Sequence, residues 1–252
     1  MLSMSYSLPK KKKEIYMLKT LRNLYNYLIN LFIMKIAITG ASGKTGYRIS
    51  EEAVKNGYKV RQIIRKNSKI SEGLESLETI RVSLDNKKEL DKALKDIDAL
   101  VIATGARASL DLTGPAKVDA LGVYRQLESC KRVGIKRVIL VSSLCTGKLF
   151  HPLNLFGLIL IWKKIGENFL RTSNFEWTII RPGGLKENED IKSENINYSK
   201  EDTQINGSIP RRLVAQCCID SLKNKESINK LIEVTSSNDN KKISFKKAMQ
   251  MI

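Results

Sequence analysis

Short apolar runs alternate along this chain with longer stretches in which apolar residues recur at helical spacing. The runs predict six strands, because short runs rich in valine and isoleucine favour buried strands. They lie at 35–39, 58–65, 79–83, 99–103, 137–142 and 177–180. Helical spacing predicts helices from the loop after the first strand to Gly57, and at 87–95, 118–133 and 154–172. Strands that alternate with helices pair in parallel through right-handed crossovers, so we expect an α/β fold with a doubly wound parallel sheet.

The loop after the first strand carries Gly40, Gly43 and Gly46 at a spacing of three. Such glycines permit a tight turn, close approach of the backbone to a pyrophosphate, and close packing of helix on strand. The free amides and the dipole of the following helix attract phosphates. An ordinary strand-to-helix turn is the alternative, but a strand precedes the loop and an apolar helical face, formed by Ile49, Ala53 and Val54, follows it. The context therefore predicts a Rossmann fold that binds a dinucleotide.

The end of the second strand indicates which dinucleotide binds. NAD sites usually place a carboxylate there, about twenty residues after the loop, on the ribose 2′-hydroxyl. This chain has Arg65 and Lys66 instead. A guanidinium pairs with a 2′-phosphate, which a carboxylate would repel, and Lys44 in the loop adds positive charge. We therefore expect NADP(H), with NAD(H) as the second choice and a solvated strand end as the alternative for Arg65.

Composition limits the remaining classes of function. The chain has 252 residues, of which 42% are hydrophobic, and no linker divides residues 34–252, so we expect a single domain. Its four cysteines lack metal-ligand spacing and it has one histidine, His151, so we expect no metal site and a reducing compartment. We give His151 a structural interpretation rather than a catalytic one.

The net charge of +18 suggests a polyanion partner. Lysine and asparagine are frequent throughout, however, and no compact basic stripe stands out beyond the N-terminus, so we predict no nucleic-acid function. Residues 1–33 form a basic N-terminal extension with two interpretations. They are untranslated sequence upstream of a start at Met34, or a basic amphipathic helix that makes peripheral membrane contact.

Several motifs resemble the atypical short-chain dehydrogenase/reductases, the NAD(P)H-binding group. Residues 39–46 match the fingerprint of that group, Leu84-Asp85 lies where its members contact adenine, and Ser142 matches its strand-five serine. Residues 111–115, 141–146, and 161–163 with 181–185 resemble the dehydrogenase-like subunit of the chloroplast inner-envelope translocon and its cyanobacterial relatives. The resemblance covers about residues 34–235 and lacks the Pro/Ser-rich tail by which the plant protein holds ferredoxin–NADP reductase.

The resemblance also implies catalytic positions. Members with a Tyr-x-x-x-Lys pair use the phenol as acid or base, and Lys163 matches the lysine that holds the nicotinamide ribose. The tyrosine position falls on Ile159, which has no proton to give, and general acid–base catalysis typically contributes about 10²–10⁴-fold. Ser142 and Lys163 are thus the candidate catalytic residues of a slow enzyme.

These patterns lead to one set of expectations. The candidate cofactor-binding residues are Gly40, Ser42, Gly43, Lys44, Thr45, Gly46, Arg65, Leu84, Asp85, Ala103, Thr104, Gly105, Ser142, Lys163, Pro182, Gly183 and Gly184. We expect residues 181–184 to follow the sixth strand and to let the backbone pass close to the nicotinamide, with a simple turn as the alternative. We expect residues 152–162 to form a buried or dimer-interface helix, with peripheral docking on a membrane as the alternative, and residues 186–208 to form a flexible substrate-side loop.

The function we expect is that of a weak NADP(H)-dependent oxidoreductase or a redox-responsive regulatory or assembly factor. A non-catalytic Rossmann-fold interaction scaffold is the alternative. We expect a monomer or homodimer in a bacterial cytosol or plastid stroma, with a small-molecule or protein partner that the sequence does not identify.

Overall fold

The computed structural model describes residues 33–106, 113–148, 150–155, 157–187 and 195–252. The chain divides into two units, Met1–Met34 and Lys35–Ile252, and the second is described below. The two interpretations of the basic N-terminal extension concern residues 1–33, of which 1–32 lie outside the described residues.

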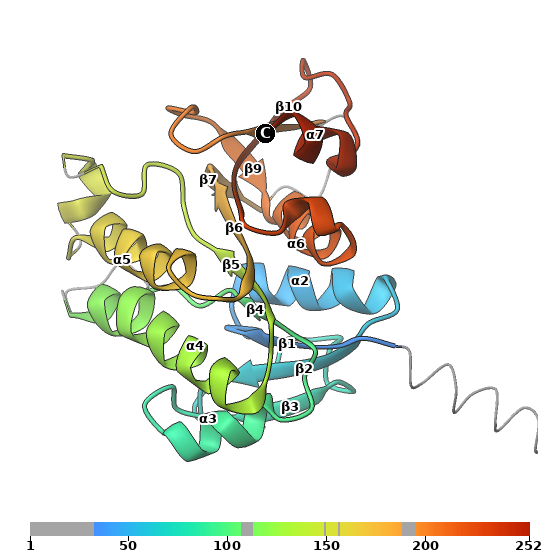
Figure 1. Cartoon of the computed structure of the whole chain (residues 1–252), viewed down its shortest axis with the longest axis vertical. Coiled ribbons are helices and arrows are strands. Elements are labelled where there is room, and N and C mark those ends of the chain that lie inside the picture. The colour runs from blue at the N-terminus through green and yellow to red at the C-terminus, as the bar shows by residue number, and fades with distance from the viewer. Residues whose placement is uncertain (1–32, 107–112, 149, 156, 188–194) are drawn as a thin grey trace, which may run out of the picture. The chain divides into compact units, whose positions relative to one another are not determined.

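An eight-stranded sheet forms the centre of the second unit (Figure 1). Its strands are β1 (Lys35–Thr39), β2 (Lys59–Ile64), β3 (Glu78–Arg81), β4 (Ala99–Ile102), β5 (Arg137–Val141), β6 (Glu176–Pro182), β8 (Asn195–Ser199) and β10 (Lys230–Ser237). Their spatial order is β3-β2-β1-β4-β5-β6-β10-β8. All neighbours pair in parallel except β8, which runs antiparallel to β10 at one edge. The six predicted strands and the doubly wound α/β fold are confirmed.

Helices cover both faces of this sheet, as Figure 1 shows. They are α2 (Lys44–Lys55), α3 (Lys87–Leu94), α4 (Gly122–Val133), α5 (Ile159–Arg171), α6 (Arg211–Lys223) and α7 (Phe245–Met251). One apolar core joins the sheet to α2, α6 and α7, and a second joins it to α3 and α4. Ile49 and Ala53 lie in the first core, as predicted, whereas Val54 is exposed. None of the helices in the described ranges has the length and apolar character to cross a membrane.

The long helix predicted over 154–172 is wrong at its start. A short 3₁₀ helix, η2 (Pro152–Leu155), is followed by Gly157 and Leu158, whose φ angles of 78° and 57° are left-handed and interrupt the helix before α5. The Asn154 side chain accepts a hydrogen bond from the Leu160 amide at 3.0 Å, which stabilises this break. The side chain of Leu155 is 83% exposed, so residues 152–162 do not form one buried helix.

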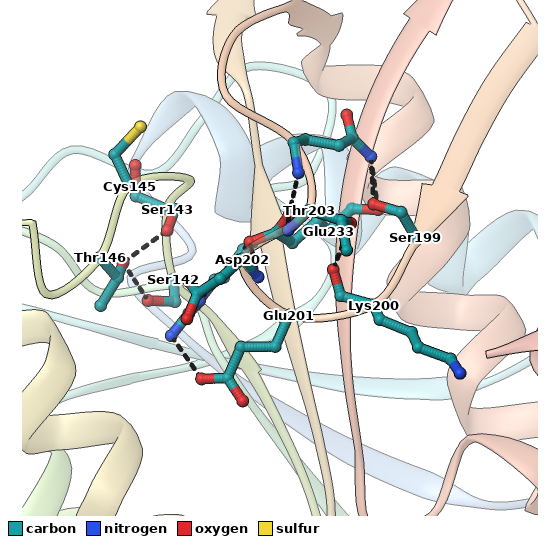
Figure 2. A network of polar contacts seen from close by, with 12 residues as sticks. Ser142, Ser143, Cys145, Thr146, Ser199, Lys200, Glu201, Asp202, Thr203 and Glu233 are labelled. Atoms are coloured by element: carbon teal, nitrogen blue, oxygen red, sulfur yellow. Dashed lines mark hydrogen bonds and ion pairs between the residues drawn. The ribbon is translucent and has the colours of Figure 1, made fainter.

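The segment predicted as a flexible loop over 186–208 contains ordered structure. It contains β8, and its two ends belong to β7 (Gly184–Lys186) and β9 (Ser208–Pro210), which pair in parallel. Residues 188–194 of this predicted loop lie outside the described residues. Between β8 and β9, residues 200–207, here called the strap, lie against β10. The Glu233 carboxylate accepts hydrogen bonds from the amides of Asp202, Thr203 and Gln204 at 2.9, 3.1 and 2.8 Å. Figure 2 shows Asp202 and Thr203 gathered around Glu233.

Candidate functional site

A cleft of about 620 Å³, here called the main cleft, opens at the carboxyl ends of β1, β2 and β4 and beyond β3. In doubly wound sheets ligands bind at these ends, where the strand order reverses; β1 is the reversal point here because it pairs with both β2 and β4. The cleft is lined by Thr39, Gly40, Ser42, Gly43, Ile63, Ile64, Arg65, Lys66, Asn67, Ser68, Val82, Ser83, Leu84, Asp85, Ala103, Thr104, Gly105, Lys117, Val118 and Arg125.

The glycine loop forms the floor of the main cleft as its spacing predicted. Gly40 has a left-handed φ of 74°, and a Cβ there would lie 2.7 Å from the Ala103 carbonyl oxygen. A Cβ on Gly46 would lie 2.2 Å from the Gly40 carbonyl oxygen, so α2 can approach the loop this closely only with glycine at that position. The first helical hydrogen bond runs from the Tyr47 amide to the Gly43 carbonyl at 2.8 Å. The amides of the first turn of α2 before Tyr47 therefore have no acceptor within the helix, and amides at such a position can bind an anion.

Arg65 follows β2 directly and lines the main cleft with an exposed side chain. The turn behind it is fixed, because the Ser68 amide donates to the Arg65 carbonyl at 3.0 Å and the Arg81 guanidinium donates to the carbonyls of Lys66 and Ser68. Lys66 is paired with Glu89 at 3.0 Å, whereas the described part of the chain offers the Arg65 guanidinium no ion-pair partner. Arg65 is therefore free to bind an anion.

The wall beyond β3 contains Leu84 and Asp85, which the resemblance places against adenine, and both line the main cleft. Asp85 is the one carboxylate among the described residues of the lining, and it is ion-paired with Arg125 of α4. The remaining charged groups of the lining are cationic. This charge balance favours a ligand that carries several phosphates.

A small cavity of about 10 Å³, here called the inner cavity, lies beside the main cleft at the ends of β4 and β5. Thr104 lines both spaces, and its hydroxyl oxygen is buried without a hydrogen-bond partner in the described structure. Ser142 and Lys163, the two candidate catalytic residues, also line the inner cavity. The Ser142 hydroxyl lies 3.4 Å from that of Thr146, which Figure 2 shows between Ser142 and Ser143.

Sequence reasoning missed the partner of Lys163. Its Nζ lies 2.7 Å from Oδ1 of Asp119, whose side chain is 2% exposed. Asp119 belongs to a π-helical turn, η1 (Ala116–Leu121), and its other carboxylate oxygen accepts the Ala106 amide at 3.1 Å. A buried carboxylate in a π-turn is a signal of function that only the structure provides, because π-turns concentrate at functional sites. Ile159 is the first residue of α5, one turn before Lys163 in the same helix.

Other candidate residues lie outside the lining of both spaces. Lys44 is 71% exposed and its Nζ lies 3.3 Å from Glu187, and Thr45 and Gly46 lie inside α2. Arg181 and Pro182 belong to β6 rather than following it, so the prediction that residues 181–184 come after the sixth strand is wrong at its start.

Gly183 and Gly184 follow, and a Cβ on Gly183 would lie 2.6 Å from the Gly207 carbonyl oxygen. Contact between chain segments therefore accounts for Gly183 without a ligand. The cofactor role of Pro182, Gly183 and Gly184 stays a prediction.

Arg181 anchors a second polar cluster, here called the Arg181 cluster. Its guanidinium, 0% exposed, donates to both carboxylate oxygens of Glu167 at 2.9 and 2.7 Å. Glu201 and Asp202 of the strap accept from it at 3.1 and 2.9 Å. Burial opposes the charged form, but the hydrogen bonds and charge of Glu167, with the charges of Glu201 and Asp202, raise the pKa of Arg181.

The cysteines are all free. Burial raises the pKa of the Cys130 thiol to about 12, which makes it unreactive. Within the described ranges no group of three or more metal-ligating side chains could hold an ion, and His151 does not line the main cleft.

Comparison with known proteins gives a family and several relatives. Residues 40–225 match the model of the NAD(P)H-binding family. An uncharacterized chloroplastic protein of Arabidopsis thaliana is 33% identical over 226 residues, covering 84% of this chain and 80% of the relative. The chloroplastic protein TIC 62 of Pisum sativum is 31% identical and covers 79% of this chain, which spans 42% of that longer protein. Sanguinarine reductase of Eschscholzia californica is 28% identical, with 81% of this chain and 89% of the relative covered.

Solved structures agree in fold. An NAD-dependent epimerase/dehydratase-type protein from Bacillus halodurans superposes with a TM-score of 0.75 at 24% identity, covering 87% of this chain and 100% of that one. A short-chain dehydrogenase/reductase from Veillonella parvula, solved in complex with NADP, superposes with a TM-score of 0.66 at 20% identity over 84% of this chain and 99% of that one.

Proposed function

This chain belongs to the NAD(P)H-binding family, and on that premise we propose that it binds NADP(H) in the main cleft as a weak oxidoreductase or a redox-responsive regulatory factor. The observation that carries the proposal is Arg65, a cation without a partner in the described structure at the end of β2. The 2′-phosphate of NADP(H) would be the anion that pairs with the Arg65 guanidinium.

The residues present fit such a cofactor. The amides at the start of α2 would hold the pyrophosphate, and Gly40, Ser42 and Gly43 line the cleft where it would lie. Glycine at positions 40 and 46 permits this tight loop, because Cβ atoms there would clash with the chain itself. Leu84 and Asp85 would flank the adenine. The buried Thr104 hydroxyl, unpartnered in the described structure, with Ser142 and Lys163, would accept the nicotinamide half. When bound, the cofactor would supply a hydride.

The chemistry at the inner end of the site determines how fast a substrate could be reduced. By the resemblance, Ile159 takes the place of the phenol that would donate a proton, and the Ser142 hydroxyl lies 3.4 Å from the Thr146 hydroxyl, which is not a base. Acceptors that need little proton assistance, such as a flavin, a quinone or a conjugated tetrapyrrole, suit this arrangement better than ketones do. The name of the sanguinarine reductase supports the enzymatic half of the proposal.

The chloroplastic names of several relatives support a plastid setting, with the bacterial cytosol as the alternative. Targeting is tested by tagging the full chain and a chain that starts at Met34 and comparing where each accumulates.

Calorimetric titration of the full chain with NADPH and with NADH tests the cofactor proposal. We expect NADPH to bind about tenfold more tightly or better, because charge-assisted hydrogen bonds to the 2′-phosphate contribute roughly 1.5–3 kcal/mol each. Equal affinities would contradict the preference for NADP(H). Absence of binding of either nucleotide up to millimolar concentration would favour the non-catalytic scaffold instead.

A further inference from the structure

The proposed function gives Lys163 a role at the nicotinamide half but leaves its buried partner, Asp119, unexplained. Lys163 Nζ and Asp119 Oδ1 are 2.7 Å apart, and their side chains are 15% and 2% exposed. Burial of two charges is costly, and replacing such a pair with apolar residues is often neutral or stabilising. Stability alone is therefore a weak reason for this chain to keep the pair.

The chain brings the two residues together with unusual closeness. Asp119 lies in the π-turn η1, and Lys163 lies in α5. A Cβ on Gly166 would lie 2.1 Å from the Asp119 backbone carbonyl, so only glycine lets α5 pack against η1 at this distance. Residues 44 positions apart in sequence thus meet beside the main cleft.

The pair lies directly beside the site. A Cβ on Gly105, a residue of the main cleft, would lie 3.7 Å from both Asp119 Oδ1 and Lys163 Nζ. Thr104 lines both the main cleft and the inner cavity that contains the pair, and its buried hydroxyl has no partner among the described residues. The inner cavity therefore has spare hydrogen-bonding capacity together with one negative and one positive charge.

The direction of a bound dinucleotide follows from the ends of the sheet. Arg65 lies beyond β2, and the glycine loop follows β1. A dinucleotide with its 2′-phosphate at Arg65 and its pyrophosphate at the glycine loop must place its nicotinamide half on the opposite side, beyond β4 and β5. The Asp119–Lys163 pair lies on that side.

We propose that Asp119 and Lys163 act in opposite directions on which redox form of the cofactor binds more tightly, and that their pairing holds the two effects in balance. The proposal rests on the proposed function and adds its regulation. The oxidised nicotinamide ring carries a positive charge and the reduced ring carries none. A nearby carboxylate favours the oxidised form and a nearby ammonium disfavours it. In the intact pair the two charges nearly cancel, so each side chain offsets the electrostatic effect of the other on the nicotinamide ring.

Two single substitutions should therefore shift binding in opposite directions. Asp119→Asn leaves the Lys163 ammonium alone and should weaken NADP⁺ relative to NADPH on the order of tenfold. Lys163→Met leaves the Asp119 carboxylate alone and should shift the ratio of the two dissociation constants the other way by a similar factor. The double variant should return the ratio to within about twofold of that of the unaltered chain.

Calorimetry on the full chain with NADP⁺ and NADPH measures this ratio directly and needs no substrate. Lys164→Met is the matched control, because Lys164 is the next residue of α5 and makes a similar ion pair, 2.8 Å from Glu201, but does not line the inner cavity. Its ratio should not change. Adenosine 2′,5′-bisphosphate, which lacks the nicotinamide half, should bind equally to the unaltered chain and to Asp119→Asn.

The outcomes separate the two proposals. If the unaltered chain binds neither dinucleotide, the proposed function fails and this inference fails with it. If it binds both, but the two single variants move the ratio in the same direction or by less than about twofold, the pair has a structural role and the inference alone is overturned. Thermal melting establishes that each variant is folded, and Asp119→Ser and Lys163→Gln replace any variant that is not.

Discussion

Two clusters of cations and carboxylates in this chain use the same residue types but differ in whether their arginine has hydrogen-bond and ion-pair partners. In the main cleft Arg65 is exposed and has no ion-pair partner in the described structure. In the Arg181 cluster the guanidinium is 0% exposed and bonded to Glu167, Glu201 and Asp202. Unused hydrogen-bonding capacity, rather than the presence of arginine, distinguishes a place for a ligand from a place that holds the fold together.

The largest effect should come from emptying the Arg181 cluster. Arg181→Met leaves the Glu167 and Glu233 carboxylates buried without their cation, and loss of one partner of a buried pair costs about 3–5 kcal/mol. Urea unfolding should show this loss in the free energy of unfolding. Arg171→Met, which removes a 36% exposed partner of Glu201, is the control and should cost less than about 1 kcal/mol. If Arg181→Met lost less than about 1 kcal/mol, the Arg181 cluster would contribute no more to the stability of the fold than the exposed cations of the main cleft do.

Substitution of Arg65 should give the opposite profile. Arg65→Glu should weaken NADPH binding about 10–100-fold with little effect on NADH, because the carboxylate repels the 2′-phosphate. Its free energy of unfolding should stay within about 0.5 kcal/mol of the unaltered value. Lys69→Glu makes the same change of charge at an exposed residue outside the main cleft and should leave both affinities unchanged. Equal losses for NADPH and NADH would show that Arg65 does not contact the 2′-phosphate.

Lowering the pH should weaken the Arg181 cluster, because Glu201 then becomes protonated. Partial burial works to raise the pKa of Glu201, but hydrogen bonds from Lys164 and Arg171 outweigh it and hold this pKa below its ordinary value of 4.5. A lowered carboxyl pKa contributes stability that is complete above the unfolded value and is lost as the pH falls through the folded value. In a series of melts from pH 7 to pH 3, the melting temperature should therefore decrease once the pH is lower than about 4.5. The decrease should be less steep for Glu201→Gln. Identical slopes would exclude Glu201 as a cause.

The smallest effect should come from the exposed member of the Arg181 cluster. Asp202 is 60% exposed, and its backbone amide rather than its side chain binds Glu233. Asp202→Asn should cost about 0–1 kcal/mol in urea unfolding, as exposed ion pairs usually do. A loss above about 2 kcal/mol would mean that the strap depends on this carboxylate and not on Glu233.

Features encoded within a few residues were predicted from the sequence. The six strands, the tight turn of the glycine loop at Gly40, and the place of Arg65 after β2 depend on local runs and spacing, which a sequence displays directly. The helix break before α5 was missed because Leu158 adopts a left-handed φ that its type rarely permits, held in place by the neighbouring Asn154.

Features that depend on distant partners were not predicted. The polar composition of residues 186–208 indicated a loop, but Glu233, about 30 positions after the strap, accepts three of its amides. Asp119 was not singled out because nothing near it in the sequence indicates that Lys163, 44 residues away, would meet it. The cofactor-binding and catalytic roles of the candidate residues stay predictions.

The short strand β3 affects how copies of this chain could associate. It is a four-residue edge strand, and its Glu78 forms ion pairs with Lys35 at 2.8 Å and Arg61 at 2.7 Å. Brief, charged borders discourage strand addition from another molecule. We therefore expect no second copy of this chain to add a strand at β3, and this side of the sheet is protected from the cross-strand stacking that begins amyloid-like aggregation.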